Sequence, residues 1–150
     1  MLCTLSPQHH TNTSIIMNIN NFKKIVPTIC DADTCATPED WKKENPIMGH
    51  CAIVSVLAQE LFGGIIVRVS LQDTPYEKFK SHYLNIINGK EHDFTLSQFK
   101  SNPYLNKEKI EKNREYILSN PNTRKRFNLL KDRFNLKLTN INNNASKKLK

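Results

Sequence analysis

The chain has 150 residues, of which 38% are hydrophobic and 24% are charged, and its net charge at neutral pH is +8. This length suits one modest globular domain, and nothing in the composition indicates a second. No segment reaches the ~18 apolar residues that a membrane span needs, and residues 1–20 lack the continuous apolar core of a signal peptide. We therefore expect a cytoplasmic protein with no membrane partner.

The N-terminal third is expected to contribute only short helices. Residues 1–16, which contain His, Thr and Asn, are predicted to form a disordered extension. A short helix is predicted over residues 21–29. Thr37 and Pro38 are typical of a helix start, as N-cap and first helical residue, and Trp41 shortly after them is expected to pack in the core near the next helix.

Residues 51–62 are apolar on almost every side and are followed by Gly63 and Gly64, which predicts a buried helix that ends there. Cys51 falls in its first turn, where unpaired amide N–H groups and the helix dipole favour an anion. That position lowers a thiol pKa from ~8.5 towards ~3.5–7.5. The alternative is that Cys51 is a small buried hydrophobic residue, as most free core cysteines are.

A strand and a hairpin are predicted after this helix. Residues 65–71 contain a β-branched run that indicates a strand. The polar segment 73–80 is expected to be a plain connection, with a substrate-facing lid as the alternative. Asn88 and Gly89 stand between apolar residues, a pattern that predicts a β-hairpin with a two-residue type I′ turn.

The hairpin register follows from this turn. Counted outward from it, His82 faces Thr95, and Leu84 faces Asp93. Because side chains alternate with period two, His82 and Asp93 are diagonal neighbours on one face. His92, one residue away, points to the other face. A carboxylate that accepts the imidazole N–H fixes the tautomer and orientation of the ring, which is the role of the third member of a catalytic triad.

Cys51, His82 and Asp93 therefore form a candidate triad for nucleophilic catalysis. The presence of His82 and Asp93 downstream of Cys51 favours a reactive thiol over a buried hydrophobic cysteine. In this hypothesis Cys51 attacks an amide or ester carbonyl as a thiolate, His82 takes and returns the proton, and Asp93 holds His82. The backbone N–H of Cys51 is a candidate oxyanion donor. His50 is expected to line or orient the site or to face solvent. Thr95 and Gln98 have the spacing of a capping box.

A final amphipathic helix is predicted to begin at Asn120-Pro121, and its apolar stripe indicates core packing. The stripe consists of Phe127, Leu130, Phe134 and Leu138. Five basic residues lie on the same helix: Arg124, Lys125, Arg126, Lys131 and Arg133. A solvated polar face explains this charge, with nucleic-acid or anionic-partner binding as the alternative. No RNA-binding motif or recognition-helix pattern is present, so we expect no nucleic-acid partner. The Asn/Lys-rich residues 139–150 are predicted to be a disordered tail, which leaves 17–138 as the single domain.

No metal or cofactor is expected. The four cysteines lack the tight Cys-x2-Cys spacing of zinc knuckles, and an adjacent cysteine and histidine rarely both ligate one tetrahedral ion. Cys3, Cys30 and Cys35 are predicted to be reduced thiols in a reducing compartment. No Gly-rich phosphate loop appears.

Taken as a set, these motifs resemble a known family. They are Asn45-Pro46 with Gly49-His50-Cys51, the apolar helix ending in Phe62-Gly63-Gly64, His82-Tyr83-x-Asn85, Asn88-Gly89, Asp93-x-Thr95 and Gln98-Phe99. Together they resemble the YunG-like family of small uncharacterised bacterial proteins over roughly residues 38–136. That family is in turn similar in motif order to transglutaminase-like and papain-type cysteine enzymes.

The resemblance implies an α+β, papain/transglutaminase-like fold, with the cysteine helix packed on a small antiparallel sheet and extra helices around it. It also implies catalytic positions at Cys51, His82 and Asp93. Asn45 resembles in position the side-chain amide that papain-type enzymes carry before their cysteine, although Asn before Pro is also a common turn opener. The family brings no substrate.

Three functions remain open at this point. The first is a cysteine-dependent hydrolase or acyltransferase whose partner is an amide- or peptide-containing substrate. The second is a catalytically silent papain-like fold that binds a peptide or protein, and the third is a basic nucleic-acid-associated protein. The sequence specifies neither the oligomeric state nor the choice between hydrolysis and transfer.

Overall fold

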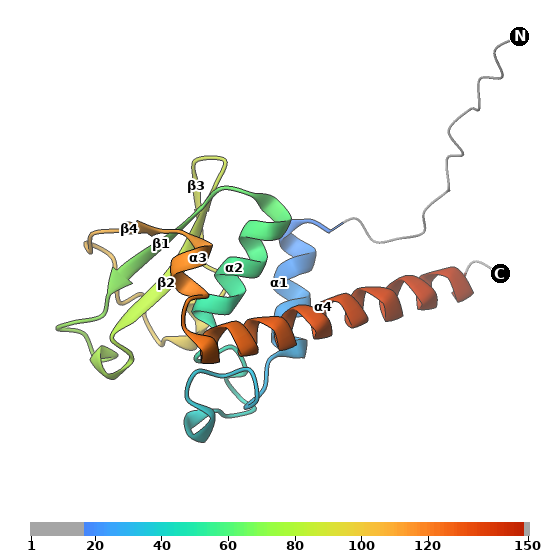
Figure 1. Ribbon diagram of the computed structural model, residues 1–150, viewed down its shortest axis with the longest axis horizontal. Coiled ribbons are helices and arrows are strands. Elements are labelled where there is room, and N and C mark those ends of the chain that lie inside the picture. Colours follow the sequence, from blue (N-terminus) through green and yellow to red (C-terminus); the bar gives the residue numbers. More distant parts are fainter. Residues whose placement is uncertain (1–16, 149–150) are drawn as a thin grey trace, which may run out of the picture.

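The computed structural model describes residues 17–148 (Figure 1). Its helices are α1 (Ile19–Ile29), α2 (Cys51–Phe62), α3 (Arg114–Ile117) and α4 (Pro121–Lys148), and its strands are β1 (Ile65–Ser70), β2 (Ser81–Ile87), β3 (Lys90–His92) and β4 (Ile110–Lys112). Short 3₁₀ turns cover Pro38–Asp40, Glu77–Phe79 and Leu96–Gln98. The predicted extension at 1–16 lies outside the described residues.

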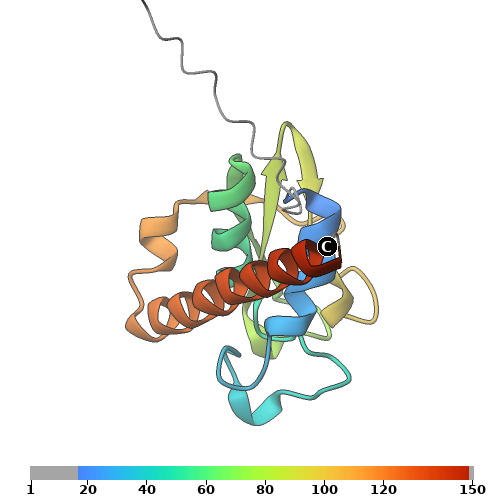
Figure 2. The same cartoon turned by 90° about the vertical axis from the view of Figure 1, so that its right-hand side faces the viewer.

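The elements form an antiparallel sheet with helices stacked on one face. The strand order is β3-β2-β1-β4. Helix α2 packs on β2 and β1, and α4 packs on α2 and α1, so that in Figure 2 the helices α1 and α4 lie in front of the strands. The prediction of an α+β domain with a helix on a small antiparallel sheet is therefore confirmed. Within residues 17–148, no helix combines the length and hydropathy of a membrane span.

The core is built around α2. All six residues from Ile53 to Ala58 are buried, as an all-round apolar helix requires. Phe22 of α1 contacts this core through edge-on ring contacts with Phe62, Phe94 and Phe134, at centroid distances of 5.5, 4.9 and 5.8 Å. The two terminal helices are thus joined to the helix that carries Cys51.

The hairpin has the predicted register from the turn to Asn85 and His92, whereas the predicted pairs His82–Thr95 and Leu84–Asp93 lie beyond the end of β3. Ile87 pairs with Lys90 and Asn85 pairs with His92, and both turn residues, Asn88 and Gly89, have positive φ, as a type I′ turn demands. β3 ends after only three residues. The first part of β2, from Ser81 to Leu84, therefore pairs with β1 on one edge but not with β3 on the other.

The predicted disordered tail at 139–150 is wrong for residues 139–148, which continue α4. Asn is a poor helix former, but Leu138 and Ile141 pack against the core and extend the apolar stripe by one more turn. Tertiary packing here overrides the intrinsic preference of the Asn-rich sequence.

The segment before α2 also differs from expectation. In place of a helix, Thr37 precedes a single 3₁₀ turn at Pro38–Asp40 and its side chain makes no capping hydrogen bond. Trp41 is only half-buried, and its indole N–H donates to the Pro46 carbonyl at 3.0 Å. Pro38 begins the turn as predicted, but Thr37 does not cap it, and the segment is too short to propagate a helix. Strand β4 and helix α3 have no sequence signal that we recognised.

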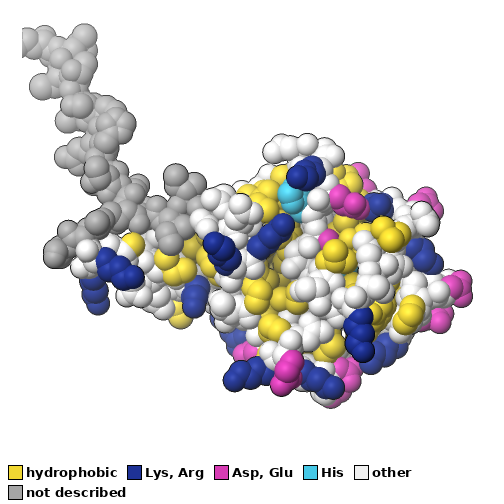
Figure 3. Space-filling view, turned by 180° about the vertical axis from the view of Figure 1, so that it is seen from behind, with side chains coloured by type: hydrophobic (Ala, Val, Ile, Leu, Met, Phe, Trp, Pro, Cys, Tyr) yellow, Lys and Arg dark blue, Asp and Glu magenta, His cyan; other side chains and the backbone are white. Residues whose placement is uncertain are grey.

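The basic side chains of α4 do not form one solvated face. Lys131 binds Glu60, and Arg133 binds Asp31. Arg126 is buried. On the molecular face of Figure 3 basic and acidic side chains are interspersed. Intramolecular contacts therefore account for much of the charge on this helix.

A glycine substitution tests the junction between α2 and β1. Gly64 has φ +76°, and a Cβ there would collide with the carbonyl oxygen of Ile86. Gly89 has a similar φ of +75° but open space around it. We expect Gly89→Ala to cost about 1–2 kcal/mol of unfolding free energy and Gly64→Ala about 1–3 kcal/mol more, measured by urea denaturation. Equal losses would mean that the junction adjusts to the methyl group.

Candidate active site

Cys51 is the first residue of α2 and is partly exposed. The chain reaches it through Gly49, whose φ of +78° and close approach to Cys35 both exclude a larger residue. The Gly49 carbonyl accepts from the Ala36 N–H at 3.0 Å, and the Gly49 N–H donates to Gln98 Oε1 at 3.3 Å. The start of α2 is thus held by two other segments of the chain.

His82 and Asp93 meet as the hairpin register predicted. His82 Nε2 lies 2.7 Å from Asp93 Oδ2, and both side chains are almost fully buried. The same carboxylate oxygen accepts from the Tyr104 hydroxyl at 2.8 Å. The other oxygen accepts from the backbone N–H of Thr95 at 3.1 Å. Asp93 is therefore fixed by several donors, of which the imidazole is one.

Two aromatic rings fix the orientation of the His82 ring. Phe99 meets it edge-on at a centroid distance of 4.9 Å, and Tyr104 stacks on it at 5.6 Å with an interplanar angle of 20°. Because Nε2 is bound to Asp93, the remaining nitrogen is Nδ1. That atom is buried and has no hydrogen-bond partner among the described residues. A buried, unpaired imidazole nitrogen is costly unless another group uses it.

The Cys51 thiol is the candidate partner for the unpaired Nδ1 of His82. Cys51 and His82 line the same cavity, whose volume is about 240 Å³. Burial raises the pKa of the Cys51 thiol, but interaction with His82 and with the backbone N–H of Tyr83 outweighs this and lowers it below its usual value. The first part of β2 has no β3 partner, so its backbone groups on that edge are not used by the sheet. The backbone N–H of Tyr83, in this part of β2, interacts with the Cys51 thiol.

The pKa of His82 shifts in the complementary direction. Burial alone would lower it, but the hydrogen bond that His82 donates to Asp93 and the interaction with Cys51 raise it to about 9. A thiol with a lowered pKa beside an imidazole with a raised one favours a thiolate–imidazolium pair near neutral pH. Because the two groups titrate together, these shifts belong to the pair.

The remainder of the cavity wall comes from segments that are distant in sequence. Its other lining residues are Ala36, Thr37, Gly49, Ala52, Lys78, Phe79, Lys80, Ser81, Tyr83, Gln98, Phe99 and Arg126. The polar segment 73–80, expected to be a plain connection, thus supplies part of this wall. Sequence spacing did not identify Gln98 or Arg126 as site residues, because they lie far along the chain from the cysteine.

Asn45 does not line the cavity. Its amide N–H₂ donates to the backbone carbonyl of Gln98 at 3.1 Å, and that contact holds the loop after the hairpin. The Gln98 side chain lines the cavity instead. Gln98 Nε2 donates to Thr95 Oγ1 at 3.1 Å, although the hydroxyl of Thr95 makes no helix-capping hydrogen bond. The predicted capping box is therefore wrong, and both residues belong to the network around Asp93.

His50 neither lines the cavity nor faces solvent, and of the three expected roles only that of orienting the site remains. It is fully buried, with Nδ1 2.9 Å from the Met48 carbonyl and Nε2 2.7 Å from Thr34 Oγ1. A carbonyl only accepts, so Nδ1 carries the proton and Nε2 accepts from the hydroxyl. Burial is the main cause that lowers the pKa of His50 to about 4. It is a neutral structural side chain that fixes the turn before Cys51.

Asn85 connects the strand of His82 to the helix of Cys51. Its amide N–H₂ donates to the carbonyl of Ser55 in α2 at 2.9 Å, and the side chain is fully buried. This cross-link sets the position of α2 along β2. The Asn85 in the predicted family motif therefore has a structural use.

The other described cysteines, Cys30 and Cys35, are buried and free, and burial raises the pKa of the Cys30 thiol to about 12. Cys3 lies outside the described residues. Within residues 17–148, no group of His, Cys, Asp and Glu side chains has the arrangement of a metal site.

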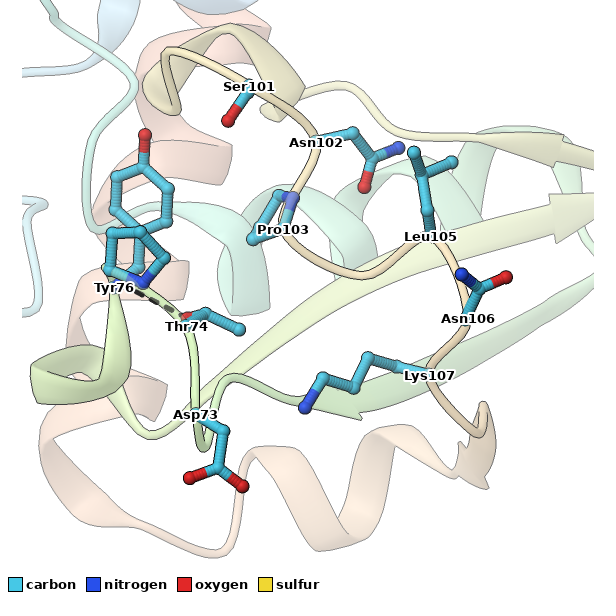
Figure 4. A pocket seen from close by; sticks show the side chains of 10 residues that line it. Asp73, Thr74, Tyr76, Ser101, Asn102, Pro103, Leu105, Asn106 and Lys107 are labelled. Atoms are coloured by element: carbon cyan, nitrogen blue, oxygen red, sulfur yellow. Dashed lines mark hydrogen bonds between the residues drawn. The ribbon is translucent and has the colours of Figure 1, made fainter.

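A second hollow of about 370 Å³ adjoins the cavity (Figure 4). Segments 73–76 and 101–107 form it, and it is lined by no cysteine or histidine. The two hollows are neighbours, because Tyr76 of the second packs at 4.6 Å on Phe99 of the first. Cys51 and His82 line the smaller hollow, whereas Asp93 lines a different one, of about 500 Å³.

These features define an α+β domain in which a helix-start cysteine shares a cavity with a His–Asp pair. Residues 18–139 match the family model described as YunG protein, and the chain belongs to this family. The Uncharacterized protein YunG of Bacillus subtilis (strain 168) is 33% identical over 61 residues, which are 41% of this chain and 48% of the relative. The chain thus matches about half the length of that relative. No solved structure matches the chain.

The state of His82 gives a direct test of this site. We expect ring NMR signals of His82 to report a protonated imidazole up to pH about 9, whereas His50 stays neutral down to about pH 4. Asp93→Asn removes the negative charge and leaves only a neutral amide oxygen as acceptor, so it should lower the His82 pKa by about 1–3 units. A wild-type His82 that titrates near 6.5 would contradict the buried pair.

Proposed function

We propose that this protein is a cysteine-dependent hydrolase or acyltransferase that acts on an amide or peptide bond through Cys51, His82 and Asp93. One observation carries the proposal. The buried imidazole of His82 is bound by Asp93 at Nε2 and has no described partner at Nδ1, while it shares a cavity with a thiol of lowered pKa. Most buried polar atoms are paired, so an open nitrogen beside a nucleophile points to use in proton transfer.

The reaction runs in two halves. In the first, the Cys51 thiolate attacks the acyl carbon and forms a C–S bond, and the carbonyl electron pair moves to oxygen. When the intermediate collapses, the C–N bond breaks and the His82 imidazolium gives its proton to the leaving amine. In the second half, water or another amine attacks the thioester after His82 removes its proton, and the Cys51 thiolate is released.

Asp93 keeps His82 in the required tautomer. A carboxylate on Nε2 holds the proton at that nitrogen and leaves Nδ1 to exchange a proton with the thiol and the substrate. The donors from Tyr104 and Thr95 hold the carboxylate itself in place. Asp93 thereby stabilises the imidazolium without taking its proton.

Two donors are available for the oxyanion. The backbone N–H of Cys51 lies in the first turn of α2, where amide groups have no intrahelical acceptor. The side-chain amide of Gln98 lines the cavity and retains one N–H after its bond to Thr95. Gln98 takes the role first considered for Asn45, whose amide is bound to a backbone carbonyl.

The order of the elements supports a papain/transglutaminase-like relationship as part of this proposal. The cysteine begins a buried helix, the histidine is on the strand β2, and the aspartate follows the next strand in sequence, β3. This order is the one that the motif resemblance implies. The proposed location of the protein, the reducing cytoplasm, is consistent with the free thiols of Cys30, Cys35 and Cys51.

Thiol reactivity tests the proposal without a known substrate. We expect brief iodoacetamide treatment at pH 6 to label Cys51 in preference to the other cysteines, as mapped by mass spectrometry. His82→Ala should slow this labelling, because each unit by which the thiol pKa rises removes about 90% of the remaining thiolate at that pH. Preferential labelling of Cys3, Cys30 or Cys35 would contradict the assignment.

Asp93→Asn separates an enzyme from a silent fold. His92→Ala is the matched control, because His92 stacks on Phe94 at 6.0 Å and points away from the pair. We expect Asp93→Asn to slow turnover of an amide or ester found in a substrate screen, on the scale of the ~10⁴ loss in the serine triad. Equal labelling and turnover in wild type, Asp93→Asn and His92→Ala would favour a peptide-binding module.

Gln98→Leu tests the oxyanion assignment. Alkylation of a thiol forms no oxyanion, so the variant should keep the Cys51 labelling rate within a few-fold of wild type. Turnover of the same amide or ester should fall by about 10²–10³, as when an oxyanion donor is removed elsewhere. Asn45→Leu serves as the comparison. A larger turnover loss in Asn45→Leu than in Gln98→Leu, with both variants folded, would return the role to Asn45.

A further inference from the structure

Among the Lys and Arg residues of 17–148, Arg126 alone is buried, at 8% exposed, and it lines the cavity of Cys51 and His82. Its hydrogen bonds go to neutral oxygens: Nε to Asn122 at 2.9 Å, one terminal nitrogen to the Thr34 carbonyl at 3.1 Å, and the other to Thr123 at 3.3 Å. Within residues 17–148 it forms no ion pair with a carboxylate. A buried charge without a counter-ion costs several kcal/mol of folding free energy.

The Arg126 guanidinium has N–H groups that form no hydrogen bond within the described residues. It carries five N–H groups, and the three hydrogen bonds use one N–H on each nitrogen. One N–H therefore remains on each terminal nitrogen. A carboxylate accepts from such a pair in a bidentate arrangement, which is stronger and more specific than a bond to a neutral oxygen.

The rest of the cavity has the same sign of charge. Lys78 and Lys80 line it and are exposed, and no Asp or Glu is among its lining residues. Asp93 contacts His82 but does not line the cavity, and its carboxylate accepts hydrogen bonds from His82 and Tyr104. Burial lowers the pKa of Arg126, and the neighbouring groups that oppose this are the thiols of Cys35 and Cys51. The charges of the Cys51 thiolate and the His82 imidazolium offset each other, so Lys78, Lys80 and Arg126 leave the cavity with a net positive charge, which attracts a negatively charged ligand.

We propose that Arg126 binds a carboxylate of the acyl substrate, so that the protein acts on amides that carry an anionic carboxylate near the reacting carbonyl. Lys78 and Lys80 add attraction at the cavity wall. This inference rests on the proposed function and narrows its substrate class. A structural use of Arg126 alone, as a tether between α4 and the Thr34 carbonyl, leaves the two remaining N–H donors and the absence of a carboxylate partner unexplained.

Two alkylating reagents of similar size test the charge preference. Iodoacetate carries a carboxylate, and iodoacetamide is its neutral counterpart. In wild type we expect Cys51 to favour iodoacetate more than a free thiol does. Arg126→Gln should lower the iodoacetate-to-iodoacetamide rate ratio about tenfold, the scale of one charge-assisted hydrogen bond. Any loss of thiolate slows both reagents alike and cancels in the ratio.

Matched variants separate charge from fold. Lys125→Gln removes the same charge at the adjacent, exposed position of α4 and should leave the ratio unchanged. Arg126→Lys should retain part of the preference. If Arg126→Gln does not fold, the double variant Lys78→Gln/Lys80→Gln changes only exposed side chains and should still lower the ratio. An equal fall of both rates in Arg126→Gln, or an unchanged ratio in both sets, would overturn the proposal.

A binding measurement decides the question even if Cys51 proves unreactive. In Cys51→Ala, whose catalytic function is absent by design, NMR titration with succinate should give saturable shifts of the Thr37, Ala52 and Gln98 amide signals. The neutral analogue succinamide should bind at least about tenfold more weakly. Adding Arg126→Gln should abolish the succinate shifts. Succinate shifts that survive it, or equal shifts with both compounds, would overturn the carboxylate site without bearing on the triad.

Discussion

The burial of α2 is the constraint on which the site depends. Six consecutive residues of this helix are buried between the sheet and α4, so the helix cannot slide without opening the core. The buried amide of Asn85 binds the Ser55 carbonyl and fixes the axial position of α2 along β2. Cys51 at the helix start is therefore placed against the strand of His82 by core packing, and no flexible loop is needed to bring the nucleophile to its base.

The buried His82–Asp93 pair makes this arrangement dependent on pH. Both side chains are out of water, and an ionised carboxylate there is tolerable only because Tyr104, Thr95 and His82 satisfy it. The folded-state pKa of His82 is raised to about 9 from 6.5. Its contribution to stability is therefore fully present below about pH 6.5 and is lost as the pH rises through about 9. The pKa of His50 is lowered to about 4, so its contribution is present above 6.5 and is lost as the pH falls towards 4.

What the sequence could predict was local. The Asn88-Gly89 turn fixes the register of the hairpin, because a two-residue loop permits only one pairing, and the His82–Asp93 contact follows from it. The apolar pattern of residues 51–62 is also a local signal, because a helix that is apolar on all sides must be buried. Gln98, Tyr104 and Arg126 were missed because they reach the site through irregular loops and a helix packed from the far side, where no period relates sequence distance to spatial distance. Asn45 was misplaced because its position relative to the cysteine says nothing about the carbonyl of Gln98, which binds its amide.

The charge of α4 shows how tertiary structure changes the meaning of a sequence pattern. In the sequence its five basic residues form one group, and a solvated face explains all of them. In the fold, Lys131 and Arg133 pair with acidic residues of α2 and of the segment after α1, whereas Arg126 turns inward and has none. A helix surface that carries charge for solubility has no reason to bury one arginine beside a thiol, because burial removes the hydration of the guanidinium and no carboxylate compensates for the loss. The cost of burying Arg126 is therefore best explained by the site that it lines.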